Sequence, residues 1–121
     1  MPTILVVEDD SLNLEMVKSF LSLNGYDAAA AVTAEEGLRL AQQTPLLAAL
    51  IDLRLPGGMD GLELGRRMKA NAALADIPLI AITAHNEPGL EQAAYQAGFE
   101  GFLMKPLSLA KLKQAIMATV R

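Results

Sequence analysis

The chain has 121 residues, of which 52% are hydrophobic and 20% charged, with a formal net charge of −4 and no cysteine. This length and composition predict one folded domain and exclude a disordered chain. The acidic balance excludes a basic surface for nucleic acid, so no direct binding to DNA or RNA is expected. The lack of cysteine excludes disulfides and thiol chemistry.

The N-terminus lacks the basic region of a secretion signal, because the short apolar run over residues 3–7 is followed at once by acidic residues. The other apolar runs are shorter than the roughly 18 residues that a membrane span needs. We therefore expect a cytoplasmic protein that makes no membrane contact.

The first part of the chain predicts a strand, a helix and a second strand. Residues 3–7 are apolar and β-branched, as in a strand that is buried on both faces. The helix follows Asp10 or Ser11, either of which can cap it, and ends at Asn24-Gly25. Residues 26–32 are rich in alanine, which has a low strand propensity, so this strand is predicted mainly from its position.

The middle of the chain predicts a helix, a third strand and another helix. Thr33 and Glu36 have the spacing of a capping box, which begins a helix that ends near Gln43. Residues 46–53 predict a strand, and a third helix follows Asp60-Gly61.

The last part of the chain predicts two more strands, each followed by a helix. Residues 77–83 indicate a strand, and residues 87–97 a helix closed by Gly98. Residues 101–104 form a short strand, and Ser108 caps the last helix. The apolar face of that helix contains Leu109, Leu112, Ile116 and Val120.

This alternation of strand and helix predicts an α/β fold of the flavodoxin-like (βα)5 type. Right-handed crossovers produce a five-stranded parallel sheet with helices on both faces, in the strand order 2-1-3-4-5. Residues 1–121 are all used in a single domain.

Reactive side chains follow four of the predicted strands, and the carboxyl ends of parallel strands are where ligands bind. The first strand is followed by Glu8-Asp9-Asp10 and the third ends in Asp52, while Thr83 and Lys105 end the fourth and fifth. The second strand ends in nothing reactive, as expected of an edge strand. We expect Glu8, Asp9 or both to lie beside Asp52.

Such a cluster of acids needs a counter-charge. Two carboxylates about 5 Å apart repel by roughly 3 kcal/mol at an effective dielectric constant near 20. Lys105 can neutralise one charge, and Mg²⁺ relieves more because it prefers hard oxygen ligands. Asp52 beside both cations can attack phosphorus to form an acyl phosphate, with the Thr83 hydroxyl donating a hydrogen bond to the product.

The motifs resemble those of the receiver domains of bacterial response regulators, over the whole chain. The segment that ends in Glu8-Asp9-Asp10 is similar to the family's opening, and Ile51-Asp52-Leu-Arg-Leu-Pro56 followed by Met59-Asp60-Gly61 is similar to its phosphoacceptor segment. Thr83-Ala84 and Lys105-Pro106 match the two remaining motifs.

The resemblance assigns roles to these residues. It implies that Glu8 and Asp9 are the acid pair, that Asp9 contacts the metal directly, and that Asp52 and the Arg54 carbonyl complete the protein's metal ligands. It implies a cis bond between Lys105 and Pro106. The phosphoryl group would come from a histidine of a sensor kinase or a histidine phosphotransfer protein, and the domain would catalyse only its own phosphorylation and dephosphorylation.

The resemblance also implies a conformational switch. Thr83 would move toward the phosphoryl group and Phe102 would turn inward, which reshapes the face made by the fourth helix, fifth strand and fifth helix for a downstream protein. Phe102 lacks the hydroxyl of the tyrosine that is often found there. The protein would be a monomer or a weak, phosphorylation-dependent dimer.

Two features depart from the commoner pattern. Gly57-Gly58 places one extra residue between Pro56 and Met59. Arg54 and His85 occupy positions that tune the lifetime of the phosphoryl group in the family, and we hypothesise that both slow the attack of water. His85 can equally be a plain surface residue.

Two alternatives remain at this stage. The same fold could be a docking module that binds partners regardless of phosphorylation, although pocket residues are usually lost in such modules. An aspartyl-nucleophile phosphohydrolase usually carries a second acid two residues after the nucleophile, where this chain has Arg54. The chain could be a stand-alone regulator, a phosphorelay intermediate or a receiver excised from a larger protein.

Overall fold

The computed structural model describes residues 1–85 and 87–120, and Asn86 and Arg121 lie outside the described residues. Within the described part the chain alternates five strands with five helices. The strands are β1 (Thr3–Val7), β2 (Asp27–Ala31), β3 (Ala48–Asp52), β4 (Leu79–Thr83) and β5 (Gly101–Met104). The helices are α1 (Ser11–Leu23), α2 (Ala34–Gln43), α3 (Gly61–Ala70), α4 (Leu90–Gln96) and α5 (Leu109–Thr119).

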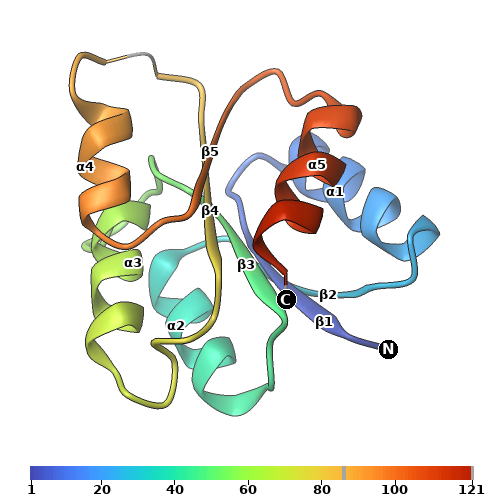
Figure 1. Ribbon diagram of the computed structural model, residues 1–121, viewed down its shortest axis with the longest axis horizontal. Coiled ribbons are helices and arrows are strands. Elements are labelled where there is room, and N and C mark those ends of the chain that lie inside the picture. The colour runs from blue at the N-terminus through green and yellow to red at the C-terminus, as the bar shows by residue number, and fades with distance from the viewer. Residues whose placement is uncertain (86, 121) are drawn as a thin grey trace.

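The strands form one sheet in the order β2-β1-β3-β4-β5, and each neighbouring pair is parallel. Helices α1 and α5 cover one face of the sheet, while α2, α3 and α4 cover the other (Figure 1). The predicted α/β class, strand order and distribution of helices are therefore confirmed. In the described part of the chain no helix has the length and apolar character needed to cross a membrane.

Side-chain alternation along the strands divides the core into two layers. In β1, Leu5 and Val7 pack on the α2, α3 and α4 side, while Ile4 and Val6 pack on the α1 and α5 side. The alanine-rich β2 pairs with β1 over its whole length, from Thr3 opposite Asp27 to Val7 opposite Ala31. Backbone pairing with β1 thus outweighs the low strand propensity of alanine.

The predicted helix caps are confirmed. Asp10 begins α1, because its carboxylate accepts hydrogen bonds from the amides of Leu12 and Asn13 at 2.9 and 3.0 Å. At α2 the Thr33 hydroxyl accepts from the Glu36 amide at 3.1 Å, and the Glu36 carboxylate accepts from the Val32 amide at 3.2 Å.

Several element boundaries differ from the predictions. The fourth helix was predicted from residue 87, but α4 begins at Leu90, because Gly89 has a left-handed backbone conformation with a φ of 81° and lies outside the helix. β2 is shorter by one residue at each end, and β3 ends at Asp52 rather than at residue 53. β3 begins at Ala48 rather than at residue 46. β4 begins at Leu79 rather than at residue 77, because Pro78 has no amide hydrogen to donate to a ladder. α5 ends at Thr119, so Val120 lies just past the helix. Leu109 is 44% exposed because it occupies the first turn, at the exposed end of the helix, and the buried face contains Leu112 and Ile116.

Candidate functional site

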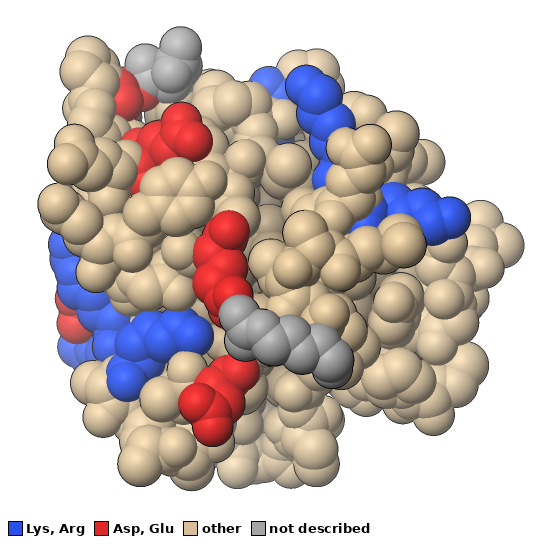
Figure 2. Space-filling view, viewed as in Figure 1, with Lys and Arg blue, Asp and Glu red and all other residues tan. Residues whose placement is uncertain are grey.

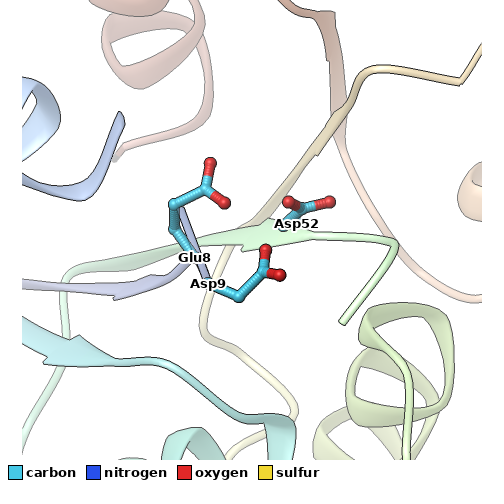
Figure 3. Close-up of side chains that lie close together, drawn as sticks. All are labelled: Glu8, Asp9 and Asp52. Carbon is cyan, nitrogen blue, oxygen red and sulfur yellow. The ribbon is translucent and has the colours of Figure 1, made fainter. Parts of the chain in front are cut away.

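Three carboxylates meet where β1 and β3 end. Val7 is paired with Ile51 in the sheet, so Glu8, which follows β1, and Asp52, the last residue of β3, are neighbours. One oxygen from each of Glu8, Asp9 and Asp52 lies within 4.8 Å of the others, and Figure 3 shows the three side chains around a common space. Glu8 and Asp52 are buried, whereas Asp9 is exposed.

Lys105, which directly follows the edge strand β5, contacts two of these acids. Its Nζ lies 2.7 Å from Glu8 Oε1 and 2.8 Å from Asp52 Oδ2. The Lys105 amide donates to the Thr83 carbonyl at 2.8 Å, which extends the pairing of β4 and β5 by one residue. The Lys105–Pro106 bond is cis. One ammonium group therefore serves two buried carboxylates.

Burial and the contacts between Lys105 and the acids shift the pKa values of Glu8 and Lys105. Burial raises the pKa of Glu8 to about 7, and the Asp52 carboxylate adds to this, against the hydrogen bonds from Lys105 and from the Asp10 amide. Burial lowers the pKa of Lys105, but the hydrogen bonds to Asp52 and Glu8 outweigh it, so the net shift is upward. Lys105 is thus held in its charged form, while Glu8 titrates near neutral pH.

Backbone contacts orient the Asp52 side chain. Its Oδ1 accepts a hydrogen bond from the Arg54 amide at 2.9 Å, while Oδ2 accepts from Lys105. Helix α3 begins against the end of β3, since a Cβ atom on Gly61 would lie 1.9 Å from the Asp52 carbonyl oxygen. Only glycine permits this approach, so α3 supports the backbone of Asp52 directly.

Thr83 ends β4 next to this pocket. Asp52 is paired with Ile82, so Thr83 lies one residue further toward the same edge of the sheet. Thr83 is fully buried, and its hydroxyl accepts a hydrogen bond from the His85 amide at 3.0 Å. His85 itself is exposed. The hydroxyl is thus held at the edge that carries Asp52.

Phe102 lies on β5 between the core and the surface. It is partly buried against the core on the α2, α3 and α4 side. It also lines a surface hollow of about 720 Å³ between α4 and β5, together with Glu87 and Tyr95. Figure 2 shows acidic side chains over α4 and basic ones over α5, and the acids that line the hollow are Glu87 and Glu91.

Glu87 is a residue at this edge that sequence reasoning missed. Its carboxylate forms an ion pair with the guanidinium of Arg54, 33 positions earlier. Glu87 was predicted as the first residue of the fourth helix, but it precedes α4, and a contact across 33 positions leaves no local signal in the sequence. The resemblance implied roles for both the carbonyl and the side chain of Arg54, and the structure adds two contacts, from its amide to Asp52 and from its side chain to Glu87.

The acid cluster fits a hard divalent cation. Glu8, Asp9 and Asp52 provide the carboxylate oxygens that Mg²⁺ prefers. Within residues 1–85 and 87–120, no group donates a hydrogen bond to the Asp9 carboxylate, so its oxygens are free for a ligand. The donor set and its burial are both suited to a Mg²⁺ ion that retains part of its water shell.

The chain matches the response regulator receiver domain over residues 4–117. It is 31% identical over 114 residues to the polar-differentiation response regulator DivK of Brucella ovis, covering 94% of this chain and 92% of DivK. A CheY-like receiver domain protein from Methanospirillum hungatei JF-1 has a TM-score of 0.90 at 29% identity, covering 98% of this chain and 92% of that one.

A further similar structure contains a metal. The receiver domain of sensor histidine kinase PA1611 from Pseudomonas aeruginosa PAO1 has a magnesium ion coordinated in its active site cleft. It matches with a TM-score of 0.87 at 30% identity, covering 97% of this chain and 95% of that one.

These matches, with the fold and the acid pocket, define the class of protein. The chain belongs to the response regulator receiver domain family of two-component signalling. Its fold is the CheY-like, flavodoxin-type arrangement of that family. Receiver domains bind Mg²⁺ at an acidic pocket, and here Glu8, Asp9 and Asp52 form the corresponding cluster.

Proposed function

We propose that Asp52 accepts a phosphoryl group from the histidine of a sensor kinase or of a histidine phosphotransfer protein. A carboxylate oxygen of Asp52 forms the new O–P bond while the N–P bond of the donor breaks. The electron pair of the N–P bond stays on the imidazole, which takes a proton from solvent. The observation that carries the proposal is the contact of Lys105 Nζ with Asp52 Oδ2 at 2.8 Å inside a cluster of acids.

Neighbouring residues have separate roles in this transfer. Lys105 is placed to neutralise the phosphoryl oxygens as charge moves between donor and acceptor. The Thr83 hydroxyl would turn from the His85 amide, to which it is now bonded, and donate to the product. Asp52 needs no general base, because an ionised carboxylate is already a nucleophile.

Mg²⁺ is the proposed cofactor, and Glu8, Asp9, Asp52 and the Arg54 carbonyl would hold it. When bound it would supply positive charge to the phosphoryl oxygens beside that of Lys105. Exposure of Asp9 gives the pocket an open side, toward which the donor can approach. The chain would then catalyse its own dephosphorylation, in which water attacks phosphorus, the O–P bond breaks, and phosphate and the Asp52 carboxylate are released.

Phosphorylation would be read at the face made by α4, β5 and α5. Phe102 packs partly against the core and partly lines the hollow beside α4, so an inward turn of its ring would change the packing of the core and the shape of the hollow. A downstream protein partner would bind that face, and any dimer would be weak and phosphorylation-dependent.

Incubation with a small-molecule phosphoryl donor and Mg²⁺, followed by intact mass measurement, tests the proposal. Wild type should gain one phosphoryl group, and Asp52→Asn none. Asp60→Asn is the matched control, because Asp60 lies in the same segment but caps α3 through the Glu63 amide at 2.8 Å. A wild type that gains no phosphoryl group would instead favour a docking module that works without phosphorylation.

A further inference from the structure

An ion pair ties together the two loops that flank the proposed phosphorylation site. Arg54 lies two residues after Asp52, and Glu87 lies four residues after Thr83, so the pair joins the loop after β3 to the loop after β4. These two loops follow the two residues that would contact the phosphoryl group. A change at Asp52 can therefore reach the β4–α4 loop through this pair.

Both the backbone and the side chain of Arg54 make contacts at this site. Its amide donates to Asp52 Oδ1 at 2.9 Å, while its guanidinium bonds the Glu87 carboxylate. Because the backbone already touches Asp52, the guanidinium stays within a side chain's length of both acids. The two paired side chains are 47% and 49% exposed, which makes the pair a weak one that solvent screens and that can exchange.

A phosphoryl group on Asp52 would alter the competition for this guanidinium. It carries close to two negative charges and three acceptor oxygens, against one charge on Glu87. A planar guanidinium can bind either group through two parallel hydrogen bonds, so the larger charge of the phosphoryl group decides the competition. In the phosphorylated state the Arg54 guanidinium is therefore expected to contact the phosphoryl oxygens on Asp52 rather than the Glu87 carboxylate.

We propose that Glu87 is a positioning residue, which holds the Arg54 side chain away from Asp52 before phosphorylation and releases it to the phosphoryl oxygens afterwards. This inference rests on the proposed function of Asp52. Glu87 then weakens the hold on the phosphoryl group and shortens its lifetime, and loss of the ion pair frees Glu87 from the loop that follows Asp52.

The test is a double-mutant cycle on the full chain with beryllofluoride and Mg²⁺ as the phosphoryl mimic. Glu87→Gln removes the competing charge, so the affinity for the mimic should rise by about two- to fivefold, as expected for an exposed ion pair. The rate of phosphoryl loss from Asp52 should fall by a similar factor. On an Arg54→Ala background, Glu87→Gln should change neither quantity.

A variant at a neighbouring acid separates positioning from simple charge repulsion. Glu91→Gln removes an acid one helical turn further along the chain without touching Arg54, and it should leave the affinity for the mimic unchanged. Glu87→Asp keeps the carboxylate and should restore most of the wild-type affinity. The gain from Glu87→Gln should also shrink as salt concentration rises, because the competing pair is exposed.

The outcomes distinguish this inference from the function on which it rests. A wild type that does not bind the mimic overturns both. A wild type that binds it, with no gain from Glu87→Gln, overturns the positioning role alone. A gain that persists on the Arg54→Ala background, or an equal gain from Glu91→Gln, also overturns it, because the effect is then long-range repulsion.

Discussion

Lys105 Nζ lies 2.8 Å from Asp52 Oδ2, although the two residues are 53 positions apart and β4 separates their strands. The same nitrogen lies 2.7 Å from Glu8 Oε1. This ammonium group lies where the ends of β1, β3 and β5 meet. In the metal-free protein its positive charge offsets the cost of burying two carboxylates.

Replacing Lys105 should therefore destabilise the protein in the absence of Mg²⁺. Lys105→Met leaves Glu8 and Asp52 buried without their cation, and the free energy of unfolding at pH 8 should fall by about 1–3 kcal/mol, less than for a fully uncompensated charge because Glu8 can take up a proton. Urea unfolding measures the change. Lys111→Met is the control, since Lys111 is an exposed lysine on α5, and equal losses in the two variants would contradict the prediction.

Asp9 should determine the affinity for Mg²⁺ without affecting the fold. Its carboxylate is exposed and lies in the acid cluster, so Asp9→Asn should lower the affinity for Mg²⁺ about tenfold or more, with no loss of stability in metal-free buffer. Calorimetric titration measures the affinity. Asp10→Asn should behave as wild type, because Asp10 caps α1 and asparagine caps helices equally well.

The stability of the metal-free protein should depend on pH through Glu8. The pKa of Glu8 is raised from 4.5 to about 7, so the native state binds more protons than the unfolded state between these values. The stabilisation that comes from protonated Glu8 is therefore fully present below about pH 4.5 and is lost as pH rises through 7. The free energy of unfolding falls by on the order of 1–3 kcal/mol over this range.

Glu8→Gln isolates this contribution. The difference in melting temperature between wild type and Glu8→Gln should move in favour of the variant as pH rises from 5 to 8 without Mg²⁺. Parallel pH profiles for the two proteins would show that Glu8 titrates normally in the folded state.

Gly61 should be intolerant of any side chain. A Cβ atom there would lie 1.9 Å from the Asp52 carbonyl oxygen and 2.8 Å from the Leu53 Cα, both backbone atoms that cannot rotate away. Gly61→Ala should lower the free energy of unfolding by about 3 kcal/mol or more and slow phosphorylation of Asp52. Gly58→Ala is the control, because its Cβ would approach only Glu35, at 3.8 Å, and comparable losses in both would refute the explanation.

Most of the fold was predictable because each element carries its own local signal. The apolar run of β1, the Asp10 cap and the Thr33 and Glu36 capping box all lie within a few residues of the structure that they specify. Where the local signal was weak or overridden, the prediction suffered. β2 could be placed only by its position in the alternation, and Val120 lies beyond the end of α5.

The sequence by itself determined which side chains end the strands, because strand period and chain order place Asp52, Thr83 and Lys105 at one edge of any such sheet. Only the tertiary structure decided how they meet. The sharing of Lys105 between Glu8 and Asp52, and the pairing of Arg54 with Glu87, both join segments far apart in the chain. Such contacts leave no periodic pattern, since their geometry depends on how the strands and loops pack rather than on neighbouring residues.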